Sequence, residues 1–211
     1  MSTTSPARPV APDTTAARPW GRILAAATAL GAVPVFALMS LSGDTGAEIT
    51  RGLVDDTVPL TIGSILAVLV SAGLVACAVR LARTVPGDAG GVIALAGGAV
   101  ALMYAGYYSV FGAGAVVATE ALSAPGPGLG EAASLLLNVA EITRYAPGLA
   151  LVGAAVVARR HLPRGTGVAA GVLVLMTLVP FTSWVAALLI PVWLGVAAAM
   201  TPVTQVATLE A

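Results

Sequence analysis

The chain has 211 residues, of which 58% are hydrophobic and 9% are charged, and its formal net charge is zero. A soluble domain carries about 25% charged residues, and a soluble surface this poor in charge would aggregate. The composition therefore excludes an ordinary soluble protein and predicts an integral membrane protein with the lipid bilayer as its partner. The basic residues are all arginine and form no long tract, which excludes nucleic acid as a partner.

Residues 1–19 are rich in Ser, Thr, Pro and Ala and contain no apolar core. This composition predicts a disordered tail, which we place in the cytoplasm. The apolar run 20–42 follows, and it is longer than the roughly 7–15 residues of a usual signal-peptide core. We therefore expect an uncleaved first membrane helix, with a cleaved signal peptide ending near "ALMSLSG" as the alternative.

Long apolar runs separated by short turns make up most of the chain. A bilayer core is about 30 Å thick, so one helical crossing needs roughly 20 apolar residues. Uninterrupted runs of this length exclude the alternating pattern of a β-barrel. Pro59 suits a first helical turn, Pro86 and Gly87 predict a turn, and "SAPGPGLG" (123–130) predicts a loop. The first four predicted spans are 20–42, 58–82, 90–116 and 134–158.

The stretch "DTGAEITRGLVDD" (44–56) is the most charged part of the chain between two spans. We predict a solvated loop there. Asp55 and Asp56 are adjacent carboxylates, but a divalent cation needs more oxygen ligands at set spacings. We therefore do not predict a divalent-cation site at Asp55 and Asp56.

The last apolar run, 167–200, would be about 51 Å long as one helix, which exceeds the thickness of a bilayer. The sequence "VPFTSW" (179–184) contains Pro180, and Ser183 could cap a new helix. We therefore predict a hairpin of two short helices, about 166–180 and 184–201. A re-entrant hairpin and a single kinked helix are the alternatives.

Six spans divide the arginines unequally between the two sides of the membrane. Eight lie on the side of both termini and two on the other, and the positive-inside rule places the richer side in the cytoplasm. We therefore predict a disordered cytoplasmic tail (1–19), a six-helix transmembrane domain (20–201) and a short cytoplasmic C-terminal tail (202–211). The eight are Arg8, Arg18, Arg22, Arg80, Arg83, Arg159, Arg160 and Arg164; the two are Arg51 and Arg144.

The third span carries two residue patterns. Small residues recur every four positions, which predicts close packing against another helix, within the bundle or in a homodimer. They are Gly97, Ala101, Ala105, Ser109 and Ala113. Tyr104, Tyr107 and Tyr108 lie in the outer half of the same span. We expect them, with Trp20 and Trp184 at helix ends, to anchor at the headgroup level, and a pocket lined by the tyrosines is the alternative.

A candidate polar intramembrane site lies in the fourth span and consists of Asn138, Glu141, Arg144 and Tyr145. Asn138, Glu141 and Tyr145 share one helix face, and Arg144 is within one turn of Glu141. Ionisable residues inside a membrane are functional candidates. Counting back from Arg159 places Glu141 and Arg144 near the outer interface, where they either neutralise each other or form part of an ion or substrate entrance.

No catalytic, cofactor-binding or metal-binding residues are predicted. Cys77 is the only cysteine and His161 the only histidine, so the chain has no intrachain disulfide, no cysteine-based metal site and no HExxH motif. We expect Cys77 to be a small packed residue.

The segment "RRHLPRGTGVAAGVLVLMTLVPFTSWVAALLIPVWLGV" (159–196) combines a basic turn with an apolar hairpin broken by proline and followed by tryptophan. In this respect the chain resembles small, uncharacterised multi-pass membrane proteins of high-GC bacteria. The resemblance implies a helical protein of the cell (inner) membrane and carries over no activity or site residue.

The sequence favours a non-enzymatic protein of the inner membrane, either structural or an accessory subunit. Its partner would be another membrane protein or a second copy of the chain. A small transporter or channel-like protein that uses the polar site of the fourth span is the first alternative. A membrane enzyme acting on lipid is the second.

Overall fold

The computed structural model of the chain describes residues 20–38, 45–121 and 126–201, and the regular structure in these ranges is all helical. The prediction of an all-α protein is confirmed. The predicted tails 1–19 and 202–211, and the end of the first span at 39–42, lie outside the described residues. The helices are α1 (Trp20–Leu38), α2 (Gly46–Asp55), α3 (Thr57–Ala82), α4 (Asp88–Val116), the short π-helix η2 (Val117–Ala121), α5 (Pro127–Val157), α6 (Thr166–Leu178) and α7 (Ser183–Met200).

Four helical segments are long and apolar enough to cross a membrane, and two more are apolar but shorter. The four are Thr57–Ala82, Asp88–Thr119, Gly128–Val157 and Ser183–Met200, and the shorter two are Trp20–Phe36 and Thr166–Leu178. α6 has 13 residues and is therefore about 20 Å long, less than the thickness of a bilayer core.

The predicted break at Pro180 is confirmed, because α6 ends at Leu178 and α7 begins at Ser183. The alternative of a single kinked helix is therefore wrong. Ser183 is the first residue of α7 rather than its cap, and Thr182 takes the cap position. The Thr182 hydroxyl instead donates to the Met176 carbonyl at 2.8 Å, which ties the turn to the end of α6.

Two predicted loops are wrong in part. Residues 46–55 form α2 because Thr45 and Glu48 make a capping box, in which each side chain accepts a hydrogen bond from the other residue's backbone N–H. The predicted loop 123–130 ends early because α5 begins at Pro127. Proline fits the first helical position, where the missing N–H would have had no partner.

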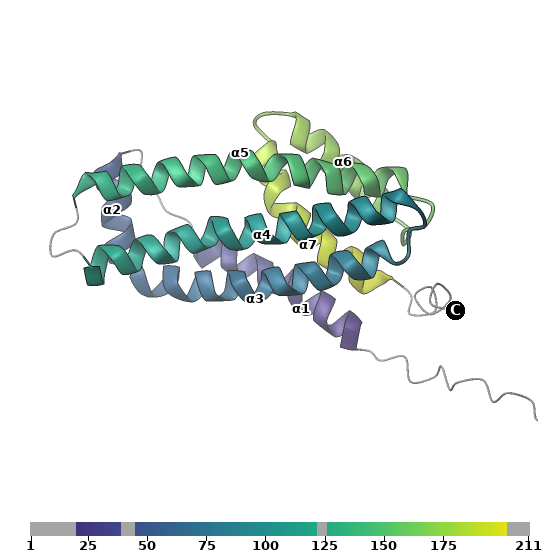
Figure 1. The fold of residues 1–211 in the computed structure, drawn as a ribbon, viewed down its shortest axis with the longest axis horizontal. Coiled ribbons are helices and arrows are strands. Elements are labelled where there is room, and N and C mark those ends of the chain that lie inside the picture. The colour runs from purple at the N-terminus through teal and green to yellow at the C-terminus, as the bar shows by residue number, and fades with distance from the viewer. Residues whose placement is uncertain (1–19, 39–44, 122–125, 202–211) are drawn as a thin grey trace, which may run out of the picture.

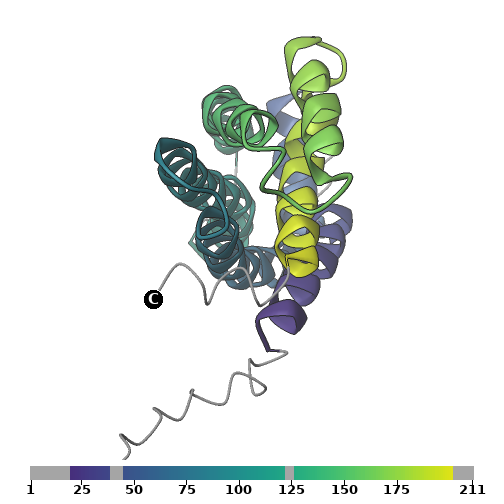
Figure 2. The ribbon, with the colours of Figure 1, turned by 90° about the vertical axis from the view of Figure 1, so that its right-hand side faces the viewer.

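The helices form two layers (Figures 1 and 2). One layer contains α3, α4 and α5, and the other contains α1, α7 and α6, with α7 in the middle and packed against α3 and α5. α2 lies across one end of the bundle and packs against the start of α5 (Figure 1). There the Gly130 N–H donates to the Thr50 hydroxyl at 3.0 Å.

Small residues bring α3 and α4 close together. A Cβ atom added to Gly97 would collide with the methyl group of Ala78, and Ala101 is 1% exposed. The predicted close packing of the third span is thus confirmed at these two positions. Ala105 is half-buried and Ala113 is exposed. The ridge leaves the interface because four residues turn a helix about 40° beyond one full turn.

One end of the bundle gathers the start of α1, the α3–α4 and α5–α6 turns and the end of α7 (Figure 1). Arg80, near the end of α3, donates from Nε to the Ala198 carbonyl at 2.9 Å and from Nη2 to the Thr201 carbonyl at 3.0 Å. A cation at this position satisfies the last carbonyls of α7 and opposes the negative end of its dipole. The same end includes the arginines at 22, 83, 159, 160 and 164.

Candidate functional site

Three tyrosines of α4 form an aromatic cluster in the interior of the bundle. Tyr107 and Tyr108 follow Tyr104 by three and four residues, which places both beside Tyr104 on one side of the helix. The rings of Tyr104 and Tyr108 meet edge to face with centroids 4.7 Å apart, and those of Tyr107 and Tyr108 with centroids 5.1 Å apart. Each such pair contributes about 0.5–1.5 kcal/mol beyond its buried area.

The prediction that these tyrosines anchor the protein at the headgroup level is wrong for two of them. Tyr104 is 8% exposed and Tyr108 is 2% exposed, so both belong to the core. The Tyr104 hydroxyl donates to the Ala32 carbonyl of α1 at 3.3 Å, which connects the two layers. Trp20 and Trp184 are exposed at helix ends, as expected for anchors.

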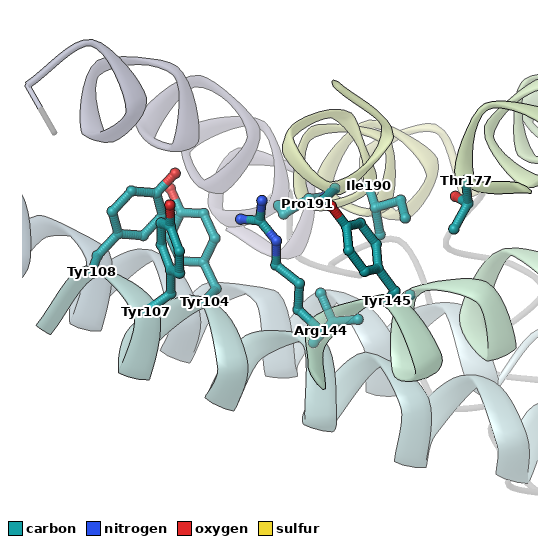
Figure 3. Close-up of a pocket in the computed structure, with 11 residues that line it drawn as sticks. Tyr104, Tyr107, Tyr108, Arg144, Tyr145, Thr177, Ile190 and Pro191 are labelled. Carbon is teal, nitrogen blue, oxygen red and sulfur yellow. The ribbon is translucent and has the colours of Figure 1, made fainter. Parts of the chain in front are cut away.

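Arg144 reaches toward the tyrosine cluster from α5, and Tyr145 lies on the other side of Arg144, beside Ile190 and Pro191 (Figure 3). The Arg144 guanidinium carbon lies 4.7 Å from the centroid of the Tyr107 ring and 5.9 Å from that of Tyr145. A cation over an aromatic face contributes roughly 0.5–1 kcal/mol at an exposed site and about 2 kcal/mol or more where water is excluded. Arg144 is half-buried, so its contribution falls between these limits.

The α6–α7 hairpin forms the remaining wall of the site, through Thr177, Ile190 and Pro191 (Figure 3). The Ser183 hydroxyl, at the start of α7, lies 3.5 Å from the Tyr145 hydroxyl. A Cβ atom added to Gly148 of α5 would lie 3.1 Å from Cδ1 of Ile190, so α5 packs closely against this side chain of α7. The turn of the hairpin therefore lies beside the middle of α5, at the level of the cluster.

These residues line a small, partly open cavity of about 20 Å³. A buried water needs roughly 10–15 Å³ of such space, so the cavity has room for about one water molecule. The charged and polar residues that line it are Arg144, Thr177 and four tyrosines. In the described ranges, no three His, Cys, Asp or Glu residues lie close enough together to hold a metal ion.

Only two of the four predicted site residues are seen to line the cavity. Arg144 and Tyr145 line the cavity. Asn138 lies on α5 with its side chain exposed and is not among the lining residues. Glu141 belongs to α5, but its side chain lies outside what the structure describes, so its pairing with Arg144 stays a prediction.

The sequence did not predict that the tyrosines of α4 and the arginine of α5 belong to one site. Its available signal was the shared spacing: residues 104, 107 and 108 on α4 and residues 141, 144 and 145 on α5 repeat the same three-and-four pattern.

Comparisons with protein-family models, with curated proteins and with solved structures found no match to this chain.

Proposed function

We propose that the chain is a non-enzymatic integral protein of the inner membrane, structural or an accessory subunit, with six membrane helices and both termini in the cytoplasm. Four helical segments with the length and apolarity of membrane spans support the membrane location. The gathering of the arginine-rich turns at one end of the bundle supports the orientation, because cytoplasmic loops are the basic ones.

The hairpin of α6 and α7 contributes the fifth and sixth membrane helices of this proposal. α6 is short for a full crossing, and local thinning of the bilayer is one way in which a membrane accommodates a short helix. A hairpin returns the chain to the side from which it entered, whether it crosses or re-enters. The cytoplasmic position of the C-terminus therefore does not depend on that choice.

A single observation carries the structural role: the side chains of the Arg144 site leave little free space between them. The guanidinium packs on the ring of Tyr107, and the cavity beside it holds about one water. Ligand pockets usually measure roughly 300–1,000 Å³. We propose that the cluster of Arg144 and the tyrosines joins the two layers and fixes the hairpin against α5, leaving the outer helix faces for a membrane partner.

A small transporter is the second candidate, because a half-buried guanidinium lies between the two layers of the bundle. The two candidates differ in what Arg144→Gln changes. If the cluster is structural, Arg144→Gln should have a lower melting temperature in detergent than the wild type. The wild-type protein should then give no ion flux above that of empty liposomes. A transport site predicts wild-type flux that disappears in Arg144→Gln with little loss of stability. Arg51→Gln, on the exposed surface of α2, is the matched control for loss of one charge.

A double-mutant cycle measures whether the cluster acts as a unit. Arg144→Gln, Tyr107→Leu and the double variant should show a coupling of about 0.5–2 kcal/mol in the free energy of unfolding, the range for a cation on an aromatic face. A second cycle of Glu141→Gln with Arg144→Gln tests the proposed pair of charges, for which contact predicts about 0.5–3 kcal/mol. Strict additivity in both cycles would remove the proposed role of Arg144 in holding the bundle together.

A further inference from the structure

A groove runs along the outer face of the α6–α7 hairpin, on the side away from the tyrosine cluster. Its volume is about 590 Å³, within the roughly 300–1,000 Å³ of small-molecule sites. Its walls come from both helices and include Val172 of α6, Trp193 and Val196 of α7, and Arg164 just before α6.

The walls of the groove are apolar and partly open to the surroundings. Val172 is 51% exposed and Val196 is 43% exposed, whereas Trp193 is 7% exposed and forms part of the floor. The indole Nε1 of Trp193 donates to the Thr166 carbonyl at 3.0 Å, so the one polar group of that side chain is satisfied within the protein. The interior of the groove therefore suits a hydrocarbon chain rather than a polar ligand.

The charge lies at one end of the groove. Arg164 lines that end, at the start of α6. The turn 158–165 also contains Arg159 and Arg160, both exposed, and no acidic residue. The first turn of α6 adds backbone N–H groups and the positive end of the helix dipole. An anionic group at this position would meet a cation while the attached hydrocarbon extends along the groove.

We propose that the groove binds an anionic phospholipid of the cytoplasmic leaflet, with one acyl chain between α6 and α7 and the headgroup phosphate at Arg164. The proposal rests on the proposed membrane location and on the cytoplasmic position of the arginine-rich end. The lipid is recognised by two features together, an apolar channel and a basic mouth. A zwitterionic lipid would fill the channel but gain less at the mouth.

Native mass spectrometry of the detergent-purified protein tests this with two lipids of identical chains, dioleoyl phosphatidylglycerol and dioleoyl phosphatidylcholine. The wild-type protein should retain phosphatidylglycerol in preference. Arg164→Gln should reduce that preference about fivefold, the factor that corresponds to about 1 kcal/mol for one arginine near an anionic surface. Arg83→Gln, which removes an exposed arginine of the α3–α4 turn at the same end, should leave the preference within twofold of wild type.

A second variant tests the channel instead of the charge. Val172→Trp places a large ring in the groove from an exposed position, so the fold should be kept, and it should reduce retention of both lipids. Val92→Trp on α4, also exposed and outside the groove, is the matched control and should retain lipid as the wild type does. Equal losses in Arg164→Gln and Arg83→Gln, or no difference between the two tryptophan variants, would overturn the groove as a lipid site. A protein found in the soluble fraction of cells would overturn the membrane proposal itself.

Discussion

Two neighbouring glycines of α4 provide a direct test of the packing between α3 and α4. A Cβ atom at Gly97 would collide with the methyl group of Ala78 and lie 3.5 Å from its Cα, whereas nothing lies within 4 Å of a Cβ atom at Gly98. Alanine in a helix is favoured over glycine by about 0.5–1 kcal/mol, and this gain is common to both positions. Overpacking costs typically 1–3 kcal/mol, and only Gly97→Ala incurs that cost.

The difference between the two variants therefore isolates the steric term. We expect Gly97→Ala to be less stable than Gly98→Ala by about 1–3 kcal/mol, or roughly 2–12 °C in melting temperature if a chain of this size shifts about 2–4 °C per kcal/mol. Thermal unfolding in one detergent, followed by far-UV circular dichroism, measures it. Adding Ala78→Gly to Gly97→Ala moves the methyl group to the other helix and should recover most of the loss. Equal melting temperatures for the two single variants would refute the close approach of α3 and α4.

Two polar contacts between helices give further predictions. Arg80→Met removes the charged hydrogen bonds to the last carbonyls of α7 and should cost about 1.5–3 kcal/mol of stability, whereas Arg83→Met, exposed in the following turn, should change it by less. Thr50→Val leaves the N–H of Gly130 without its acceptor and should speed amide exchange at the start of α5. Thr57→Val is the control, because the Thr57 hydroxyl donates only to carbonyls of its own chain segment, and amide exchange at Gly130 should stay as in the wild type. Unchanged exchange in Thr50→Val would show that this hydroxyl does not hold α2 against α5.

Much of the fold follows from the sequence because a long apolar run has few alternatives in a helical protein. Pro59, Pro86, Gly87 and Pro180 predict the ends of α3 and the break between α6 and α7, because these residues act through local backbone geometry. α2 was missed although its signal is local as well. "TGAE" (45–48) is a capping-box sequence, but the four acidic residues of 44–56 also fit the solvated loop that we predicted.

The candidate site depends on which helix faces meet, and a single sequence does not specify that. The spacing of the tyrosines places them on one side of α4, but it does not say whether that side faces lipid or another helix. Their burial follows from the position of α1 and α7 across the cluster. The position of Arg144 among them depends in turn on the register of α5 against α4, which contacts along both helices determine.

The proposed membrane topology is tested most directly by measuring on which side of the membrane individual segments lie. A reporter enzyme that is active only outside the cytoplasm, fused after Asp56 at the end of α2, should be active. The same reporter fused after Ala211 should be silent, and a reporter active only in the cytoplasm should give the opposite result at both positions. Immunoblots confirm that every fusion is made in equal amount. Activity of the first reporter after Ala211 would contradict the return of the chain through the α6–α7 hairpin, and silence after Asp56 would contradict the membrane crossing of α1.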